Sequence, residues 1–146
     1  MKTYVGNIYL ELPGAWDDDS TFLYREPGAD IEIRIEKFPV GPPATPDSLI
    51  EKIEERIKML GTLASPTRGK AEVTGREART LSVTCKREGD KEVSLMEVLV
   101  FKTSDTSAVS ITATAPSKQQ MALNSAWRSV LSKTKLIEVV DPAAKH

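Results

Sequence analysis

The sequence contains very few of the side chains from which catalytic sites are usually built. Its one histidine, His146, is the last of 146 residues, and nothing holds an imidazole in position at a frayed chain end. Its one cysteine, Cys85, cannot form an internal disulfide and lies in an alternating stretch typical of a buried strand. No phosphate loop (GxxxxGKS/T) or dinucleotide motif (GxGxxG) occurs. We therefore expect a protein that is not an enzyme.

Metal-binding patterns are also missing. Zinc requires several histidine or cysteine ligands, which the chain does not offer. Asp17, Asp18 and Asp19 are adjacent, but a calcium loop spaces its ligands in alternation and needs a central glycine and a distal glutamate. The pattern predicts a solvated turn over residues 15–20, with no metal and no cofactor. Other carboxylates could form an acid–base pair, but their positions on strands and on the polar face of a helix indicate a solvated surface.

An excess of positive charge and long apolar runs are absent as well. The 20 lysines and arginines are balanced by 21 aspartates and glutamates, which disfavours a nucleic-acid partner. No apolar run reaches the roughly 18 residues that span a bilayer, so we expect no stable membrane insertion. The first residues show neither an apolar leader nor a lipid-attachment cysteine, and the expected location is the cytoplasm.

The composition is that of one globular domain, with 40% apolar and 28% charged residues. We expect a single domain over residues 1–140 and a flexible tail over residues 141–146. Residues 94–101 are apolar on both faces, as in a central strand that is covered on both sides. Alternating apolar residues predict strands over residues 7–12, 21–25, 31–38, 71–85 (with a break near Gly75), 91–103 and 108–115.

Two amphipathic helices complete the pattern. Thr45 is a good N-cap with Pro46 behind it, and an apolar face runs to Leu60, with Gly61 as a plausible C-cap. A second helix follows Pro116, where Ser117 and Gln120 fit a capping box. The order is strands, helix, several strands, helix, without repeated βαβ units. It predicts an α+β fold, a twisted and mainly antiparallel sheet with two main helices packed on it.

The stretch Leu12-Pro13-Gly14-Ala15-Trp16-Asp17-Asp18-Asp19-Ser20 resembles the opening of the DcrB-like and Eag-chaperone group. That group shares the fold of PsbP, the extrinsic photosystem II protein. The resemblance covers nearly the whole chain in order, although each of its pieces is short. The further matching segments are Ala29–Glu36, Asp47–Leu60, Arg76–Cys85, Lys91–Phe101, Ile111–Pro116 and the helix that carries Ala126-Trp127.

The resemblance implies a function. Eag-type members are dimeric chaperones of type VI secretion effectors, and they shield hydrophobic transmembrane segments near the N-terminus of the effector before export. DcrB-like members are envelope lipoproteins, and the start of this chain favours the cytoplasmic branch. The expected partners are therefore the N-terminal hydrophobic segments of a secreted effector and a second copy of the chain.

The resemblance also implies a binding surface, an apolar groove on one face of the sheet. Thr21 departs from the aliphatic residue that the chaperones tend to carry. A register error of one residue would move every member to the other face, and the alternative interpretation of these residues is core. The expected lining is Thr21, Leu23, Ile31, Ile33 and Ile35, extended by Val98 and Val100.

A second functional hypothesis is a general PsbP-like interaction or assembly module that binds a folded partner through its loops. The acidic residues Asp17, Asp18 and Asp19 would then matter more than the sheet, and binding would depend on salt.

Overall fold

The structure is a computed structural model that describes residues 2–5, 8–11, 17–20, 23–25, 30–41, 43–87, 89 and 91–136. Two helices and a short 3-10 helix (Ser117–Gln119) accompany ten strands in this part of the chain. The helices are α1 (Pro46–Lys58) and α2 (Gln120–Lys133). The strands are β1 (Lys2–Val5), β2 (Ile8–Glu11), β3 (Asp17–Ser20), β4 (Leu23–Arg25), β5 (Glu32–Pro39), β6 (Gly61–Val73), β7 (Arg76–Arg87), β8 (Ser94–Ser104), β9 (Ser107–Pro116) and β10 (Lys135–Leu136).

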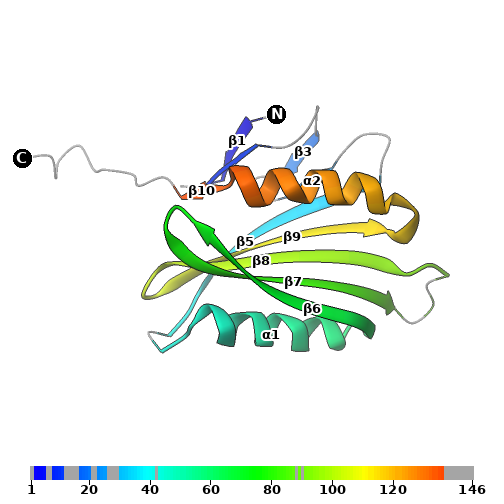
Figure 1. Ribbon diagram of the computed structural model, residues 1–146, viewed down its shortest axis with the longest axis horizontal. Helices are drawn as coiled ribbons and strands as arrows, with labels where there is room; N and C mark the ends of the chain where they lie inside the picture. Colours follow the sequence, from blue (N-terminus) through cyan, green and yellow to red (C-terminus); the bar gives the residue numbers. More distant parts are fainter. Residues whose placement is uncertain are drawn as a thin grey trace, which may run out of the picture.

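Seven of the described strands form one sheet in the order β3-β4-β5-β9-β8-β7-β6, and each neighbouring pair is antiparallel. A small sheet of β1, β2 and β10 lies at the end of α2 (Figure 1). The chain therefore has the predicted α+β fold, in which two helices pack on an antiparallel sheet. Consecutive strands from β6 to β9 are neighbours in the sheet. Strand β5 instead pairs with β9, which lies far from it in the sequence.

The two helices lie on opposite sides of the large sheet (Figure 1). Each side has its own core, because side chains of a strand alternate between the faces. The core under α2 contains Phe101 and Trp127, and the core under α1 contains Leu81 and Val98. Strand β8 contributes to both cores, which confirms the prediction of a central strand covered on two sides. Cys85 is buried in the α1 core, also as predicted.

Helix α1 begins where the sequence predicts. The hydroxyl of Thr45 accepts a hydrogen bond from the backbone N–H of Ser48, and the Ser48 hydroxyl accepts one from the backbone N–H of Thr45. This reciprocal pair satisfies two donors that the helix itself leaves unpaired. Pro46 occupies the first turn, where its missing N–H costs nothing.

Strand β6 was not expected in full. The predicted strand over residues 71–85 is two strands, joined at Thr74-Gly75, which both have positive φ as in a two-residue hairpin turn. Strand β6 begins directly after α1, so Gly61 starts a strand and does not cap the helix. Apolar and polar residues alternate only weakly along β6, because it is an exposed edge strand with a register shift between Ala64 and Thr67.

Two further local expectations were wrong. Residues Asp17–Ser20 form the edge strand β3 and not a turn, because pairing with β4 outweighs the low strand propensity of aspartate. No side chain caps α2, and Ser117 begins the short 3-10 helix that precedes it. The tail over residues 141–146 lies outside the described residues.

Candidate functional site: a groove beside α1

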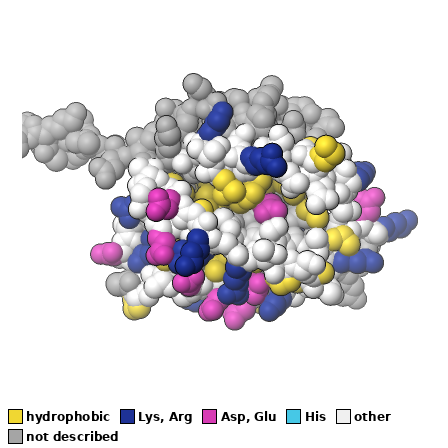
Figure 2. Space-filling model, viewed as in Figure 1, with side chains coloured by type: hydrophobic (Ala, Val, Ile, Leu, Met, Phe, Trp, Pro, Cys, Tyr) yellow, Lys and Arg dark blue, Asp and Glu magenta, His cyan; other side chains and the backbone are white. Residues whose placement is uncertain are grey.

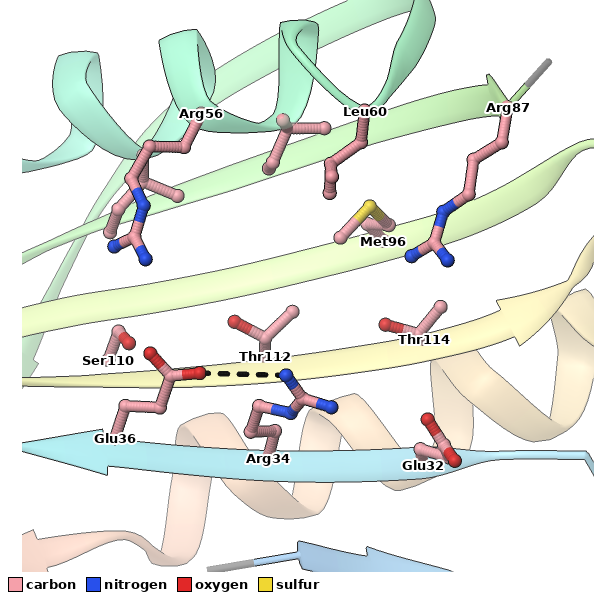
Figure 3. A pocket seen from close by; sticks show the side chains of 12 residues that line it. Glu32, Arg34, Glu36, Arg56, Leu60, Arg87, Met96, Ser110, Thr112 and Thr114 are labelled. Atoms are coloured by element: carbon pink, nitrogen blue, oxygen red, sulfur yellow. Dashed lines mark ion pairs between the residues drawn. The ribbon is translucent and has the colours of Figure 1, made fainter.

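Helix α1 covers only part of its side of the sheet. It packs on β6, β7 and β8 and leaves the neighbouring strip of β9 and β5 uncovered (Figures 1 and 3). The result is a groove of about 220 Å³ between the helix and β5, which we call the α1 groove. Its lining comes from five elements and consists of Ile53, Arg56, Ile57 and Leu60 at α1, Arg87 on β7, Met96 on β8, Ser110, Thr112 and Thr114 on β9, and Glu32, Arg34 and Glu36 on β5.

The helix side of the groove is apolar. Ile53 and Ile57 lie one turn apart on α1, and Leu60 follows at its end. Ile57 is buried, whereas Leu60 keeps 52% of its surface exposed. Met96 lies below Leu60 and continues this apolar wall onto the sheet (Figure 3). The wall therefore offers accessible apolar surface to a ligand.

The floor of the groove is polar. Ser110, Thr112 and Thr114 alternate along β9 with Ile111 and Ala113, which face the core under α2. Within the part of the chain that the structure describes, the hydroxyls of the three groove residues make no side-chain hydrogen bond. They are therefore available to polar groups of a ligand.

Charged side chains line two borders of the groove. On β5 an ion pair of 3.8 Å joins Arg34 Nη1 to Glu36 Oε1, and Glu32 Oε1 accepts a 2.8 Å hydrogen bond from Arg25 Nε. Arg56 and Arg87 point into the groove from the other border (Figure 3). Neither of these two guanidinium groups forms an ion pair with any described residue. The groove therefore has an uncompensated positive charge on the helix side.

Ion pairs fix the position of α1 and so of the apolar wall. Arg79 Nε on β7 donates a 2.7 Å hydrogen bond to Asp47 Oδ1 in the first turn, and its Nη2 donates a 2.8 Å bond to Glu77. The Arg79 hydrogen bond lowers the pKa of Asp47. In the second half of the helix, Arg68 Nη2 donates a 2.9 Å bond to Glu54. Both ends of α1 are thus tied to the sheet.

The residues predicted from sequence to line a groove lie elsewhere. Thr21 is outside the described residues, and Leu23 of β4 pairs its backbone with Arg34 of β5. The other five have at most 1% of their surface exposed, and they divide between the two sides of the sheet. The prediction of one groove lined by all of them is therefore wrong, because helices α1 and α2 cover these strand faces. The core under α2 contains Ile31, Ile33 and Ile35, and the core under α1 contains Val98 and Val100.

The actual groove lies on the other face of the predicted strand. Glu32, Arg34 and Glu36 alternate with the buried isoleucines, and their strip of sheet becomes accessible because α1 lies to one side. The alternation of polar and apolar residues was visible in the sequence and marks this face as uncovered. The sideways position of the helix was not visible, since it depends on which strands become neighbours.

The opposite side of the sheet is also only partly covered. Figure 2 shows apolar side chains in a hollow between α2 and the strands, whereas charged side chains gather along α1. On this side Glu97 of β8 lies next to Ser82 of β7, whose hydroxyl donates a 2.7 Å hydrogen bond to it. Burial raises the pKa of Glu97, and the Ser82 bond opposes this shift.

Replacing Glu97 with glutamine is expected to stabilise the protein at neutral pH by about 0.5 kcal/mol. A folded-state pKa above the unfolded value means that unfolding releases a proton. Stability therefore falls as pH rises from the unfolded to the folded pKa, and the penalty is absent below both. The gain should vanish near pH ~3, more than one unit below the ordinary glutamate pKa of about 4.3, where Glu97 is protonated in both states.

Urea denaturation of the wild type and of Glu97→Gln, from neutral to acidic pH, measures the difference in stability. Glu92→Gln, at an exposed position before β8, is the matched control and should change little at either pH. A Glu97→Gln variant that is less stable than the wild type at neutral pH would contradict the expected sign.

No protein-family model matches the sequence, and no curated protein matches it either. Solved structures do match. LpqN of Mycobacterium tuberculosis, described as involved in cell envelope biogenesis, has a TM-score of 0.71 and 14% identity over 94% of this chain and 90% of LpqN. PA94 of Pseudomonas aeruginosa, described as a protein of unknown function and a putative regulator, has a TM-score of 0.62 and 19% identity over 97% of both chains. At these identities the likeness shows a shared fold.

The described residues lack both a membrane-spanning helix and a cluster of metal-ligating side chains. No described helix is long and apolar enough to cross a membrane. Within the same residues, no three histidine, cysteine, aspartate or glutamate side chains gather as they would around a metal ion.

Proposed function

We propose that this protein is a non-catalytic chaperone that covers hydrophobic segments of a type VI secretion effector before export. The observation that carries the proposal is the α1 groove, where accessible apolar surface from Ile53 and Leu60 meets free hydroxyls on β9. The resemblance of the sequence to Eag-type chaperones supplies the class of partner. Such a chaperone acts before export, so the proposal places it in the cytoplasm.

The chemistry of the groove suits one face of a helical segment. A transmembrane helix exposed to water aggregates, because its apolar surface has no other cover. The wall of the groove can cover part of that surface, and the hydroxyls of Ser110, Thr112 and Thr114 can bind small polar side chains on the same helix.

The size of the groove supports a dimer as part of the proposal. A membrane-spanning helix of roughly 20 residues is about 30 Å long. A groove of about 220 Å³ holds only a few side chains of such a helix. A second copy of the chain would supply a second groove and cover more of the segment.

Replacing Leu60 with aspartate is expected to weaken capture of the effector segment about 30-fold while the protein stays folded. A carboxylate in the apolar wall would lose its water when the segment binds, and an ion pair with Arg56 or Arg87 would offset only part of this cost. The measurement is co-expression with the N-terminal region of an effector encoded by a neighbouring gene, followed by co-purification. Met121→Asp is the matched control, because Met121 is 88% exposed on α2, away from the groove.

The same experiment separates the two functional hypotheses. If the protein is a module that binds a folded partner through its acidic edge strand β3, Leu60→Asp will bind as the wild type does. Charge reversal at Asp17 and Asp18 would then weaken binding, most strongly at low salt. Equal capture by Leu60→Asp and Met121→Asp would exclude the α1 groove as the binding site.

A further inference from the structure

We propose that the α1 groove selects short apolar stretches, only a few side chains long, that carry an acidic residue at each end. This inference rests on the proposed function, since it takes the occupant to be a segment of a partner protein. It adds a rule of specificity, namely that the flanking charges of the segment decide which segments the groove accepts.

The two unpaired arginines lie at opposite ends of the apolar wall. Arg56 projects from α1 at one end, Arg87 projects from β7 at the other, and Leu60 and Met96 lie between them (Figure 3). Both guanidinium groups are exposed and keep their donors free among the described residues. A segment that places apolar side chains against Leu60 can therefore bring a carboxylate to each arginine.

The charges on β5 do not offset this preference. Glu36 is paired with Arg34, and Glu32 is paired with Arg25. A basic residue at the end of a segment would meet Arg56 or Arg87 without finding a free carboxylate opposite. Like charges across an interface are unfavourable, so basic flanks should be rejected.

The spacing of the arginines favours a polypeptide over a lipid. A fatty acid carries one anionic group at one end of its chain, and a phospholipid carries its charge in one head group. A groove with cations at both ends and apolar surface between them instead matches two anionic groups separated by an apolar middle. A protein segment with acidic flanks has this arrangement.

The test uses three fluorescein-labelled helical peptides and the full chain. Each peptide has the same central block of leucine, alanine and serine, and the ends carry glutamate, glutamine or lysine. Fluorescence anisotropy at low salt measures the affinity. The glutamate peptide should bind about tenfold more tightly than the lysine peptide. The difference should shrink at high salt because both contacts are exposed.

Variants assign the preference to the two arginines. Arg56→Gln and Arg87→Gln should each weaken the glutamate peptide about threefold, and the double variant should bind all three peptides alike. Arg128→Gln, the same exchange at an exposed position on α2, should keep the wild-type preference. Circular dichroism of each variant confirms that the fold is retained.

Three outcomes would overturn the inference, and they differ in what they say of the proposed function. The first outcome is that all three peptides bind equally well and that Leu60→Asp weakens the binding of each. This result would be consistent with the proposed chaperone function and would contradict the preference for acidic flanks. Binding of phosphatidylglycerol vesicles that needs both arginines, without binding of any peptide, would assign the groove to an anionic lipid. Absence of binding to the peptides and to the effector region would remove both proposals.

Discussion

Replacing Ile33 with aspartate is expected to unfold the protein. Ile33 has no exposed surface, lies in the core between β5 and α2, and pairs across the sheet with Ala113. The variant loses a buried side chain and places a carboxylate where no partner is available. The combined cost exceeds about 4 kcal/mol, close to the whole stability of a domain with roughly 5–15 kcal/mol.

Far-ultraviolet circular dichroism and thermal denaturation measure this result. Ile33→Val is the control, and it should stay folded with a loss of about 1 kcal/mol. Leu60→Asp introduces the same charge at a site that is 52% exposed and should also stay folded. An Ile33→Asp variant with a normal melting transition would show that the α2 face of β5 is accessible, as the sequence-based groove required.

Replacing Gly61 with valine is expected to destabilise the protein by about 3 kcal/mol and to damage the α1 groove. Gly61 begins β6 beside the backbone of β7, where a Cβ atom would approach the Arg87 Cα within 2.8 Å and would also clash with the Lys86 carbonyl. Backbone atoms cannot move aside as a flexible side chain can. The strands must therefore separate, and the shift displaces Leu60 and Arg87, which both line the groove.

The measurement combines urea denaturation with the capture assay. Gly41→Val serves as the control, because a Cβ atom there meets Pro43 Cδ at 3.5 Å, an ordinary contact distance. Gly41→Val should have the same urea denaturation curve as the wild type and the same activity in the capture assay. Wild-type stability of Gly61→Val would mean that the two strands tolerate a wider spacing at this end.

Local signals in the sequence predicted the parts of the fold that local physics decides. Thr45 and Pro46 determine the start of α1, because capping needs only residues within one turn. The two apolar faces of β8 indicated a central strand, and that strand contributes to both cores. The class of fold followed from the order of such elements.

The rest depends on tertiary neighbours. Strand β6 is held by β7, and its own residues from Thr62 to Gly69 carry little alternation. The alternation along β5 predicts one polar and one apolar face, but it also led to the wrong prediction that the apolar face is the binding surface. Deciding between them requires knowing that α2 covers Ile33 and that α1 stops short of Arg34, which no local pattern contains.

The pairing of β5 with β9 has a consequence for synthesis of the chain on the ribosome. The meander from β6 to β9 joins strands that emerge one after another, so each finds its neighbour at once. Strand β5 emerges early, but its partner β9 is made near the end, as the register of Ile35 with Ile111 shows. Until β9 and the α2 helix that follows it are made, the apolar face of β5 has no cover in its own chain. The floor of the α1 groove, which β9 provides, is therefore absent during most of synthesis, and a nascent chain has no complete groove.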